Sequence, residues 1–512
     1  MNTLSFLKRH SSIVLIIASV LVVTVVSQVF YVHASIRLDE SQSIWQTSRT
    51  LRGTIATVAR DVHVPAYHVI LHYWQILFGS SIETARSLSL AFFLVSIPAF
   101  YALARLVVDK TWSRFAVLAY AFSPFMLWYA NEARMYTMLV LVAILSQYFF
   151  IRIMQHKSGW IGYSLVAMLG IYVHYFFVFN LLAQAVFFLV NRKSFAKGTF
   201  MKLGALAILL IAELSPWLYF FHKLGSASGE SPLLTKPSTV DFFNAFSQFA
   251  FGFQVDAVNT VLLSLWPILM AAALLFIRTK IHITKPIAYL LTAGLLPIVL
   301  AFAISITVRP FFISRYMISC LPALIIVLAW LLRSYPKHLR RILASVAVSV
   351  IVVTSVLQII NPLTPVKEDF RGASSYINTH ATTHDVVILS TPFTLYPFEY
   401  NYGFGAAQVR TLPEWDGRAT TGIPAFNAGQ LGSQVHALSD GHQNAYILLS
   451  YDQGYESNIK DYFQSHYPLI SQHEYSRDLT LYVYQLNPTS APKLSALPYN
   501  LKIPVPVTSQ NQ

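Results

Sequence analysis

Charged residues and cysteine are scarce in this chain of 512 residues. Lys, Arg, Asp and Glu make up 11% of it, less than half of the roughly 25% that is usual in globular proteins. The single cysteine, Cys320, excludes an intramolecular disulfide and a thiolate metal cluster. We find no internal repeat and neither of the glycine-rich nucleotide-binding motifs, GxGxxG and the P-loop.

Apolar residues are correspondingly abundant. They account for 55% of the chain, with 36 Phe, 28 Tyr and 9 Trp, and Trp and Tyr are enriched at membrane interfaces. This composition excludes a disordered chain, a collagen and a purely cytosolic enzyme. The net charge of +14 would suit a nucleic-acid-binding protein. However, many basic residues lie in short connections between apolar runs, as membrane topology requires, so we expect no nucleic-acid partner.

Runs of about 20 apolar residues, enough to cross a bilayer, predict a polytopic α-helical membrane protein with about 11 transmembrane helices. The first run exceeds the length of a signal-peptide core, so we expect an uncleaved anchor. The expected spans are residues 12–32, 84–107, 114–130, 135–152, 160–175, 176–191, 203–221, 261–277, 287–307, 313–332 and 342–360.

Lys and Arg concentrate in alternate connections, beginning with Lys8 and Arg9 before the first span. The positive-inside rule then predicts a cytoplasmic N-terminus and, with an odd number of spans, an extracytoplasmic C-terminal part. Two outward loops are long, residues 33–83 and 222–260, and we expect the catalytic residues on that side. Residues 62–79 are amphipathic and too short to span, which predicts a helix along the membrane interface.

After residue 362 the apolar runs shorten and alternate with polar segments. Strand-like and helical patterns alternate here: strands at 385–389, 445–449 and 479–484, helices at 368–380 and 456–466. We expect three regions: a transmembrane domain over 1–362, a small extracytoplasmic α/β domain over 363–490 and a disordered tail over 491–512.

Asp39 and Glu40 follow the first span in the sequence SIRLDESQSIW. A carboxylate pair at the membrane surface can accept a proton or hold a cation. The same segment also suits a helix N-cap, with Asp39 or Ser41 starting a helix over 41–52. The residues alone leave cap and catalysis equally open.

Glu132 and Arg134 lie between two short apolar stretches, at or near the outer boundary of the membrane. Ionisable groups at that depth usually face a cavity or a partner. A simple ion pair between the two is the alternative, but residues two apart on a helix do not face each other.

Three histidines follow in the first outward loop. His68 and His72 would share one helical face, shortly after His63. That face could bind a metal or a phosphate, although zinc-motif spacing is absent. Polar tips of interfacial side chains are the other explanation.

Arg309 and Arg315 flank the outer end of a span, with Tyr316 beside them. Arginine there runs against the positive-inside trend and favours an anionic partner, since a guanidinium binds phosphate in a bidentate way. Snorkelling explains these arginines equally well. His174, in GIYVHYFF, is a weaker candidate.

These segments together resemble the bacterial branch of the protein mannosyltransferase family. The resemblance rests on the Asp-Glu pair, HVPAYHVILHYWQILFG, SPFMLWYANEARMYTML, VHYFF and RPFFISRY, in that order, and covers roughly residues 10–380 with the stretch VKEDFRGASSYI. The family is part of the GT-C superfamily of polytopic glycosyltransferases, which also includes the aminoarabinose transferase acting on lipid A. A GT-C type fold is therefore expected.

The resemblance implies an inverting hexosyl- or pentosyltransferase. Its donor would be a polyprenyl-phosphate-linked sugar, and its acceptor a hydroxyl of a lipid, glycan or protein at the outer face of the cytoplasmic membrane. Asp39 would be the catalytic base and Arg315 would face the carrier phosphate. The family often has His-Pro-Pro where this chain has His63 and Val64, which leaves the role of His63 less defined.

The resemblance and the charge pattern together give one predicted site. The expected substrate-binding residues are Glu40, His63, Glu132, Arg134, His174, Arg315 and Tyr316. A divalent cation, Mg or Mn, would be held by Asp39 and Glu132. Two other classes stay open: a transporter or flippase of lipid-linked substrates, which usually shows repeated halves, and an oligosaccharide ligase that uses a lipid pyrophosphate.

Overall fold

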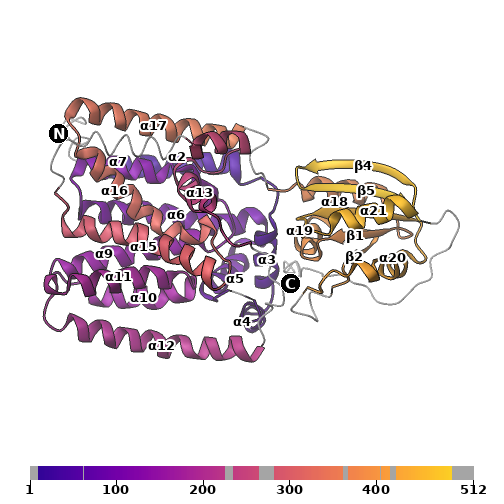
Figure 1. Ribbon diagram of the computed structural model, residues 1–512, viewed down its shortest axis with the longest axis horizontal. Coiled ribbons are helices and arrows are strands. Elements are labelled where there is room, and N and C mark those ends of the chain that lie inside the picture. Colours follow the sequence, from indigo (N-terminus) through magenta and orange to yellow (C-terminus); the bar gives the residue numbers. More distant parts are fainter. Residues whose placement is uncertain are drawn as a thin grey trace, which may run out of the picture.

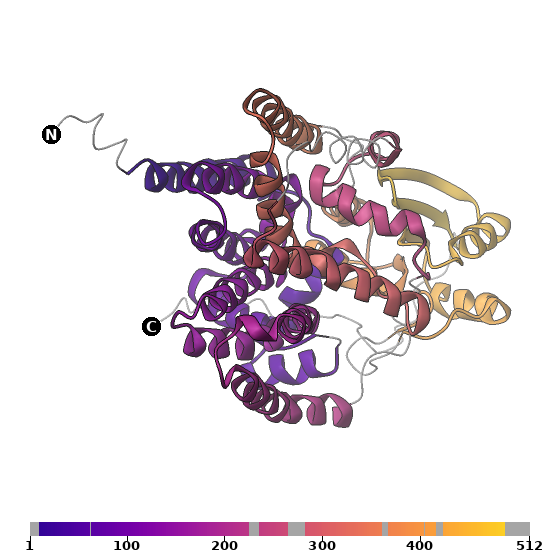
Figure 2. The ribbon, with the colours of Figure 1, turned by 60° about the vertical axis from the view of Figure 1, so that its left-hand side comes forward.

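The computed structural model describes residues 10–61, 63–224, 235–264, 282–360, 367–403, 405–415 and 423–486. Helices run side by side in one bundle, and a smaller part with a five-stranded sheet adjoins one end of it (Figure 1). In both views α17 (Lys337–Ile360) and α12 (Thr199–Leu224) lie at opposite edges of the bundle (Figure 2).

Seven helices among the described residues are long and apolar enough to cross a membrane. Besides α12 and α17 they are α2 (Ser11–Val26) with the π-helical turn η1 (Ser27–Tyr31), α6 (Ile82–Arg105), α9 (Tyr136–Met154), α15 (Lys285–Thr307), and η3 (Ser314–Cys320) with α16 (Leu321–Arg333). Two shorter apolar helices are α10 (Trp160–Val173) and α11 (Phe177–Val190). The chain is thus a multi-pass membrane protein. The span expected at 261–277 lies largely outside the described residues.

The span expected over 114–130 is divided into two helices. α7 (Lys110–Ala121) stops before Ser123, and α8 (Pro124–Ala130) begins after it. The Ser123 hydroxyl accepts the Met126 N–H, a helix N-cap. Pro124 has no N–H to continue α7 and suits the first position of a new helix. The prediction of one continuous span is therefore wrong here.

The connection over residues 33–83 also contains more helices than expected. Instead of one helix over 41–52 there are α3 (Leu38–Thr47) and α4 (Leu51–Ala59), and the N-cap of α3 is Arg37 rather than Asp39 or Ser41. The Arg37 N–H is satisfied by Glu40 Oε2 at 3.1 Å. The amphipathic helix predicted at 62–79 is α5 (Ala66–Phe78).

The C-terminal part contains a mixed sheet with strand order β2-β1-β3-β5-β4. β1 pairs in parallel with β2 and β3, and β5 is antiparallel to β3 and β4. The strands are β1 (Val386–Ser390), β2 (Gln408–Thr411), β3 (Asn444–Ser450), β4 (Leu469–Ser476) and β5 (Leu479–Gln485). The helices are α18 (Phe370–His380), α19 (Leu395–Tyr402), α20 (Leu431–Ser439) and α21 (Glu456–His466). The α/β fold predicted for this part is confirmed.

Direct contacts join the sheet part to the bundle. The Tyr400 hydroxyl accepts the Ile82 N–H at 2.9 Å, which satisfies a donor at the start of α6. The rings of Trp45 and Tyr396 lie 5.0 Å apart, so that α19 packs on α3. The sheet part therefore rests on the helix that carries Asp39 and Glu40.

We expect Gly252→Ala to destabilise the bundle. Gly252 follows α13 (Thr239–Phe251) with a φ of 68°, and a Cβ there would lie 2.3 Å from Gln358 Oε1 and 2.7 Å from Pro124. Both the left-handed backbone and the clash oppose a side chain, and the loss should exceed about 1 kcal/mol. Thermal unfolding in detergent measures it.

Gly204→Ala, in the interior of α12, is the matched control. A Cβ at Gly204 meets nothing within 4 Å, and alanine favours a helix over glycine. An equal fall in the melting temperature of both variants would contradict the interpretation of Gly252.

Candidate functional site

Asp39 and Arg315 form the solvent-accessible centre of the candidate site. Asp39 Oδ2 lies 3.1 Å from Arg315 Nη1, and the two side chains are 22% and 23% exposed. Asp39 comes from the first turn of α3, and Arg315 from the 3₁₀ turn η3. Ser314, next to Arg315, donates to Gln248 of α13 and so anchors this turn. A carboxylate and a guanidinium are thus presented together where a ligand can reach them.

Two further arginines surround Asp39. Arg134 Nη1 donates to the Asp39 carbonyl at 3.1 Å and to Ser43 Oγ at 3.0 Å. Burial alone would raise the pKa of Asp39, but Arg315, Arg134 and Arg37 outweigh that effect and hold the pKa well below its usual range. Asp39 is therefore ionised at neutral pH, in a strongly cationic setting.

His63 lies at the other end of the Arg134 guanidinium. Arg134 Nη2 and His63 Nε2 are 2.8 Å apart. Burial, together with the charge of Arg134, holds the pKa of His63 well below its usual range, so the neutral ring accepts this hydrogen bond. The sequence prediction placed both residues in one site, and the structure brings them together.

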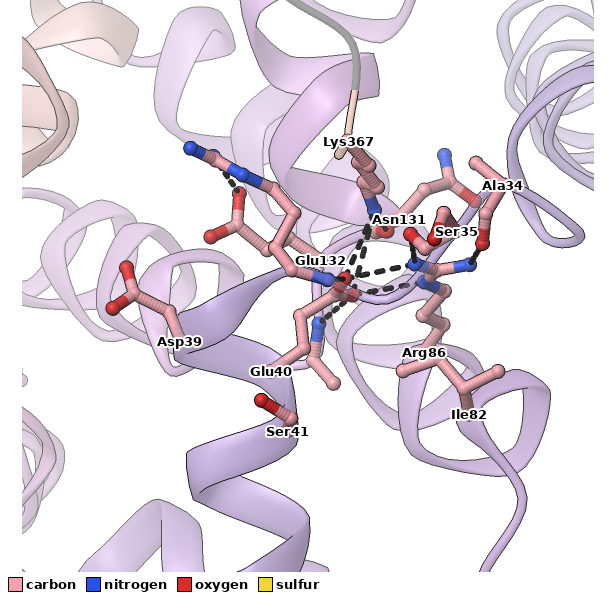
Figure 3. Close-up of polar contacts among 12 residues, drawn as sticks. Ala34, Ser35, Asp39, Glu40, Ser41, Ile82, Arg86, Asn131, Glu132 and Lys367 are labelled. Atoms are coloured by element: carbon pink, nitrogen blue, oxygen red, sulfur yellow. Dashed lines mark hydrogen bonds and ion pairs between the residues drawn. The ribbon is translucent and has the colours of Figure 1, made fainter. Parts of the chain in front are cut away.

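Glu40 points away from Asp39, into the interior (Figure 3). It has no exposed surface, and Arg86 binds it with Nε to Oε1 and Nη2 to Oε2, both at 2.8 Å. Oε1 also accepts the Ala133 N–H at 3.0 Å. Burial would raise the pKa of Glu40, but Arg86 and Lys367 reverse the effect and lower it. We expected Glu40 to bind substrate, but these internal partners occupy its carboxylate.

Glu132 is the third carboxylate and the least well paired. It is 0% exposed, neither oxygen has a hydrogen-bond partner among the described residues, and Arg37 Nη1 is 3.8 Å away. Burial raises the pKa of Glu132, and Arg37 offsets this only in part. The ion pair with Arg134 considered from the sequence is replaced by this contact with Arg37.

Aromatic side chains line the far side of Arg315. Its guanidinium lies 5.6 Å from the Tyr316 ring, which stacks on Phe176 at 4.7 Å. The His174 ring is 5.7 Å from that of Tyr316, and His174 Nδ1 accepts the Phe176 N–H at 3.1 Å. Tyr316 and His174 therefore accompany Arg315, as expected.

Three further candidates from the sequence have other surroundings. Arg309 is exposed. His72 Nδ1 is 2.9 Å from the Thr47 carbonyl oxygen, while His68 is buried and stacks with His63 at 5.6 Å. Burial lowers the pKa of His68 to about 3, with smaller contributions from His63 and Arg134.

The sequence interpretation missed Arg86, Arg37 and Lys367. Arg86 had a usable signal, because it is a charged residue inside the apolar run at 84–107, and such residues seldom lack a buried partner. Arg37 and Lys367 are basic residues in connecting segments, where a charge is ordinary.

The described residues do not favour the expected metal site at Asp39 and Glu132. They contain no group of three or more His, Cys, Asp or Glu side chains placed to hold a metal ion. Asp39 is instead paired with Arg315, and Glu132 lies nearest to Arg37. Guanidinium groups in these places repel a divalent cation and themselves supply the positive charge.

Fold and site together define a polytopic helical membrane protein with a partly exposed Asp-Arg pair, on a helix bundle that an α/β part adjoins. Residues 62–220 match the family model described as dolichyl-phosphate-mannose-protein mannosyltransferase. Over these residues the match confirms the resemblance inferred from the sequence. No curated protein matches the chain by sequence.

Solved structures with a similar fold include ArnT from Cupriavidus metallidurans. Its apo structure has a TM-score of 0.61 at 14% identity, covering 95% of this chain and 100% of that one. The structure bound to undecaprenyl phosphate has a TM-score of 0.58 at 14% identity, covering 94% and 99%. The apo oligosaccharyltransferase of Archaeoglobus fulgidus has a TM-score of 0.50 at 11% identity, covering 95% and 76%.

Glutamine substitutions should change protein stability by different amounts at the two buried carboxylates, Glu40 and Glu132. Glu40→Gln breaks a buried ion pair and leaves Arg86 uncompensated, which should cost about 3 to 5 kcal/mol. Glu132→Gln removes a poorly paired buried charge, so we expect a change within about 1 kcal/mol or a gain. Thermal unfolding in detergent at neutral pH compares them.

The sign of the pH effect provides a check on Glu132. Because its pKa is raised in the folded protein, the cost of its charge grows as pH rises through the carboxyl range. Any gain from Glu132→Gln should therefore vanish at acidic pH, where wild-type Glu132 is protonated in both states. A Glu132→Gln protein as unstable as Glu40→Gln would refute this assignment.

Proposed function

We propose that the protein is an inverting glycosyltransferase, which moves a sugar from a polyprenyl phosphate to an acceptor hydroxyl at the outer face of the membrane. The observation that carries the proposal is the Asp39–Arg315 pair, 3.1 Å apart and partly exposed. It combines a proton acceptor with a phosphate-binding group. The GT-C fold and the family match over residues 62–220 support the same reaction class.

The carrier phosphate would bind Arg315, with Arg134 and Arg37 contributing to the positive field. A guanidinium binds phosphate oxygens in a fork geometry that a single carboxylate oxygen does not fill. Phosphate would therefore draw Arg315 away from Asp39. The similar fold of ArnT has been solved with undecaprenyl phosphate bound, which supports a lipid phosphate as the ligand class.

Asp39 would then act as general base. Its most important compensating cation is Arg315, so engagement of Arg315 by phosphate raises the basicity of Asp39 when a donor is present. The acceptor oxygen forms a bond to the anomeric carbon as the carbon–oxygen bond to phosphate breaks. The acceptor proton passes to Asp39, and the bonding electrons leave with the phosphate, whose charge the arginines stabilise.

The other expected substrate contacts fit around this pair. His63 and Arg134 would orient the sugar or acceptor on one side, and His174 with Tyr316 on the other. Glu132 is the alternative base, because its raised pKa suits a group that exchanges protons. A divalent cation is not required for this charge balance.

The proposed orientation places the N-terminus in the cytoplasm and the sheet part outside. The concentration of Lys and Arg in alternate connections supports it. The acceptor would be a lipid, glycan or protein of the cell envelope.

Asp39→Asn should lower kcat by about 10²- to 10⁴-fold, the usual contribution of general-base catalysis. The KM for the donor should stay the same or fall, because asparagine no longer competes with phosphate for Arg315. Loss of label from radiolabelled polyprenyl phosphate sugars, with envelope acceptors, provides the measurement. Asp461→Asn, at an exposed position of α21, is the control.

Other outcomes identify other functions. Near wild-type transfer by Asp39→Asn would point to Glu132 as the base. Transfer only from lipid pyrophosphates would indicate an oligosaccharide ligase. Carrier binding without release of label from any donor, in the unaltered protein, would indicate a flippase.

Arg315→Lys should impair use of the donor more than use of the acceptor. Lysine keeps the charge but loses the bidentate geometry, so we expect about a tenfold or greater rise in the donor KM. Arg309→Lys is a close control, since Arg309 is exposed six positions earlier. Equal effects of the two substitutions would remove Arg315 from the phosphate site.

A further inference from the structure

Lys367 is buried at the point where the chain passes from the bundle to the sheet part. It stands between α17 and α18, and its side chain is 3% exposed. Lysines in connecting segments are normally solvated, and a buried one usually has a specific partner. Its position therefore calls for a physical explanation.

The Lys367 ammonium contacts two separate segments of the bundle (Figure 3). Nζ lies 3.4 Å from Glu40 Oε2 and donates to the Asn131 carbonyl at 2.8 Å. Glu40 belongs to α3, whereas Asn131 begins the turn between α8 and α9. One side chain from the start of the sheet part thus joins α3 to the turn between α8 and α9.

The residues that Lys367 touches are neighbours of the candidate reacting groups. Asp39 directly precedes Glu40, and Glu132 directly follows Asn131. The Ala133 N–H to Glu40 Oε1 hydrogen bond, at 3.0 Å, links the same two segments a second time. The separation of Asp39 from Glu132 therefore depends on the contacts of Glu40.

Arg86 cannot replace Lys367 in this arrangement. Its guanidinium donates to both Glu40 oxygens and to the carbonyls of Val32, Ala34 and Ser35 at 2.6 to 2.8 Å. All of its donor nitrogens are thus engaged. Without the Lys367 ammonium, the Asn131 carbonyl would lose its donor and Glu40 its second cation.

We propose that Lys367 is a positioning residue, which joins Glu40 to Asn131 and so fixes Asp39 of α3 relative to Glu132 and Arg134 of the turn. Its kinetic consequences rest on the proposed glycosyl transfer. The sheet part would thereby belong to the catalytic unit, because its first described residue completes the site.

The proposal predicts that activity depends on pH, because the charge of Lys367 does. Burial lowers the pKa of Lys367 to about 8, against the effect of Glu40; Arg86, Glu132 and Arg37 are the other charged groups that act on it. Below that pH the ammonium pairs with Glu40, and above it the neutral amine does not. Activity should therefore fall as pH rises through about 8.

This fall should not come from unfolding. The folded protein releases the Lys367 proton at lower pH than the unfolded chain, so through this window the unfolded state binds more protons. By linkage, this group makes the free energy of unfolding rise with pH rather than fall. A loss of activity without a loss of stability is the expected combination.

The variants are Lys367→Met and Lys367→Arg, with Lys460→Met as the matched control. Lys460 lies on α21 beside Tyr482, away from Glu40 and Asn131. In lipid nanodiscs, Lys367→Met should lower kcat by about 10- to 100-fold, with the donor KM changed by less than about threefold. Lys367→Arg should retain more activity and lose the alkaline fall. Unchanged kcat in a folded Lys367→Met protein would overturn the proposal.

Hydrogen exchange tests the positioning without any need for activity. In Lys367→Met, the amides of residues 38–47 and 131–134 should exchange faster, and in Lys460→Met they should not. Unchanged exchange in both segments would overturn the proposal even if activity were lost. If the unaltered protein transfers no sugar but the exchange changes as expected, the proposed function fails and the positioning role stands.

Discussion

The burial of one carboxylate, that of Glu40, is the constraint on which the rest of the site depends. An ionised carboxylate without exposed surface is stable only when hydrogen bonds and opposite charge replace its water. Here the replacements come from Arg86 of α6, the Ala133 N–H, and Lys367 ahead of α18. These groups are far apart in the chain, so the position of the first turn of α3 depends on contacts with both the bundle and the sheet part. The local geometry of the site is therefore a property of the whole fold.

Helix geometry gives neighbouring carboxylates different environments. Asp39 and Glu40 are adjacent in sequence, yet they project in different directions from the first turn of α3 (Figure 3). Asp39 stays partly exposed against Arg315, while Glu40 is enclosed. Glu132 is enclosed as well but has only a distant cation, which is why its pKa is raised where those of the other two are lowered. A strongly paired carboxylate is a weak base. In the proposed reaction Asp39 would therefore gain basicity only when an anion competes for its arginines, which would link its action as a base to the binding of a phosphate.

The sequence was informative wherever one strong physical signal acts alone. Long apolar runs predicted the spanning helices, and buried apolar runs predicted β1, β3 and β5. β4 was missed because its residues, LISQHEYS, are mostly polar and none is buried, and β2 because it has only four residues.

Unusual charges near the membrane boundary identified Asp39, Glu132, Arg134 and Arg315 one by one. Their pairing could not be predicted, because it is set by tertiary contacts. Lys367 and Glu40, for example, are 327 positions apart, and no local pattern encodes that distance.

A buried ionic cluster is a poor way to gain stability, since apolar side chains of similar volume often do as well or better. The cluster around Glu40 instead fixes the relative positions of chain segments, because its contacts are directional and each joins a different segment. Arg86 fixes the end of the first span through three backbone carbonyls, and Lys367 fixes the turn after α8 through one. Removing Arg86 or Lys367 takes a donor from a buried backbone carbonyl, that of Val32 or Asn131, so the cluster tolerates few intermediate arrangements. A rearrangement that withdrew Lys367 would therefore alter the setting of Glu40, and with it the turn of α3 that presents Asp39. In this architecture the position of the C-terminal part and the alignment of the Asp39–Arg315 pair are physically coupled.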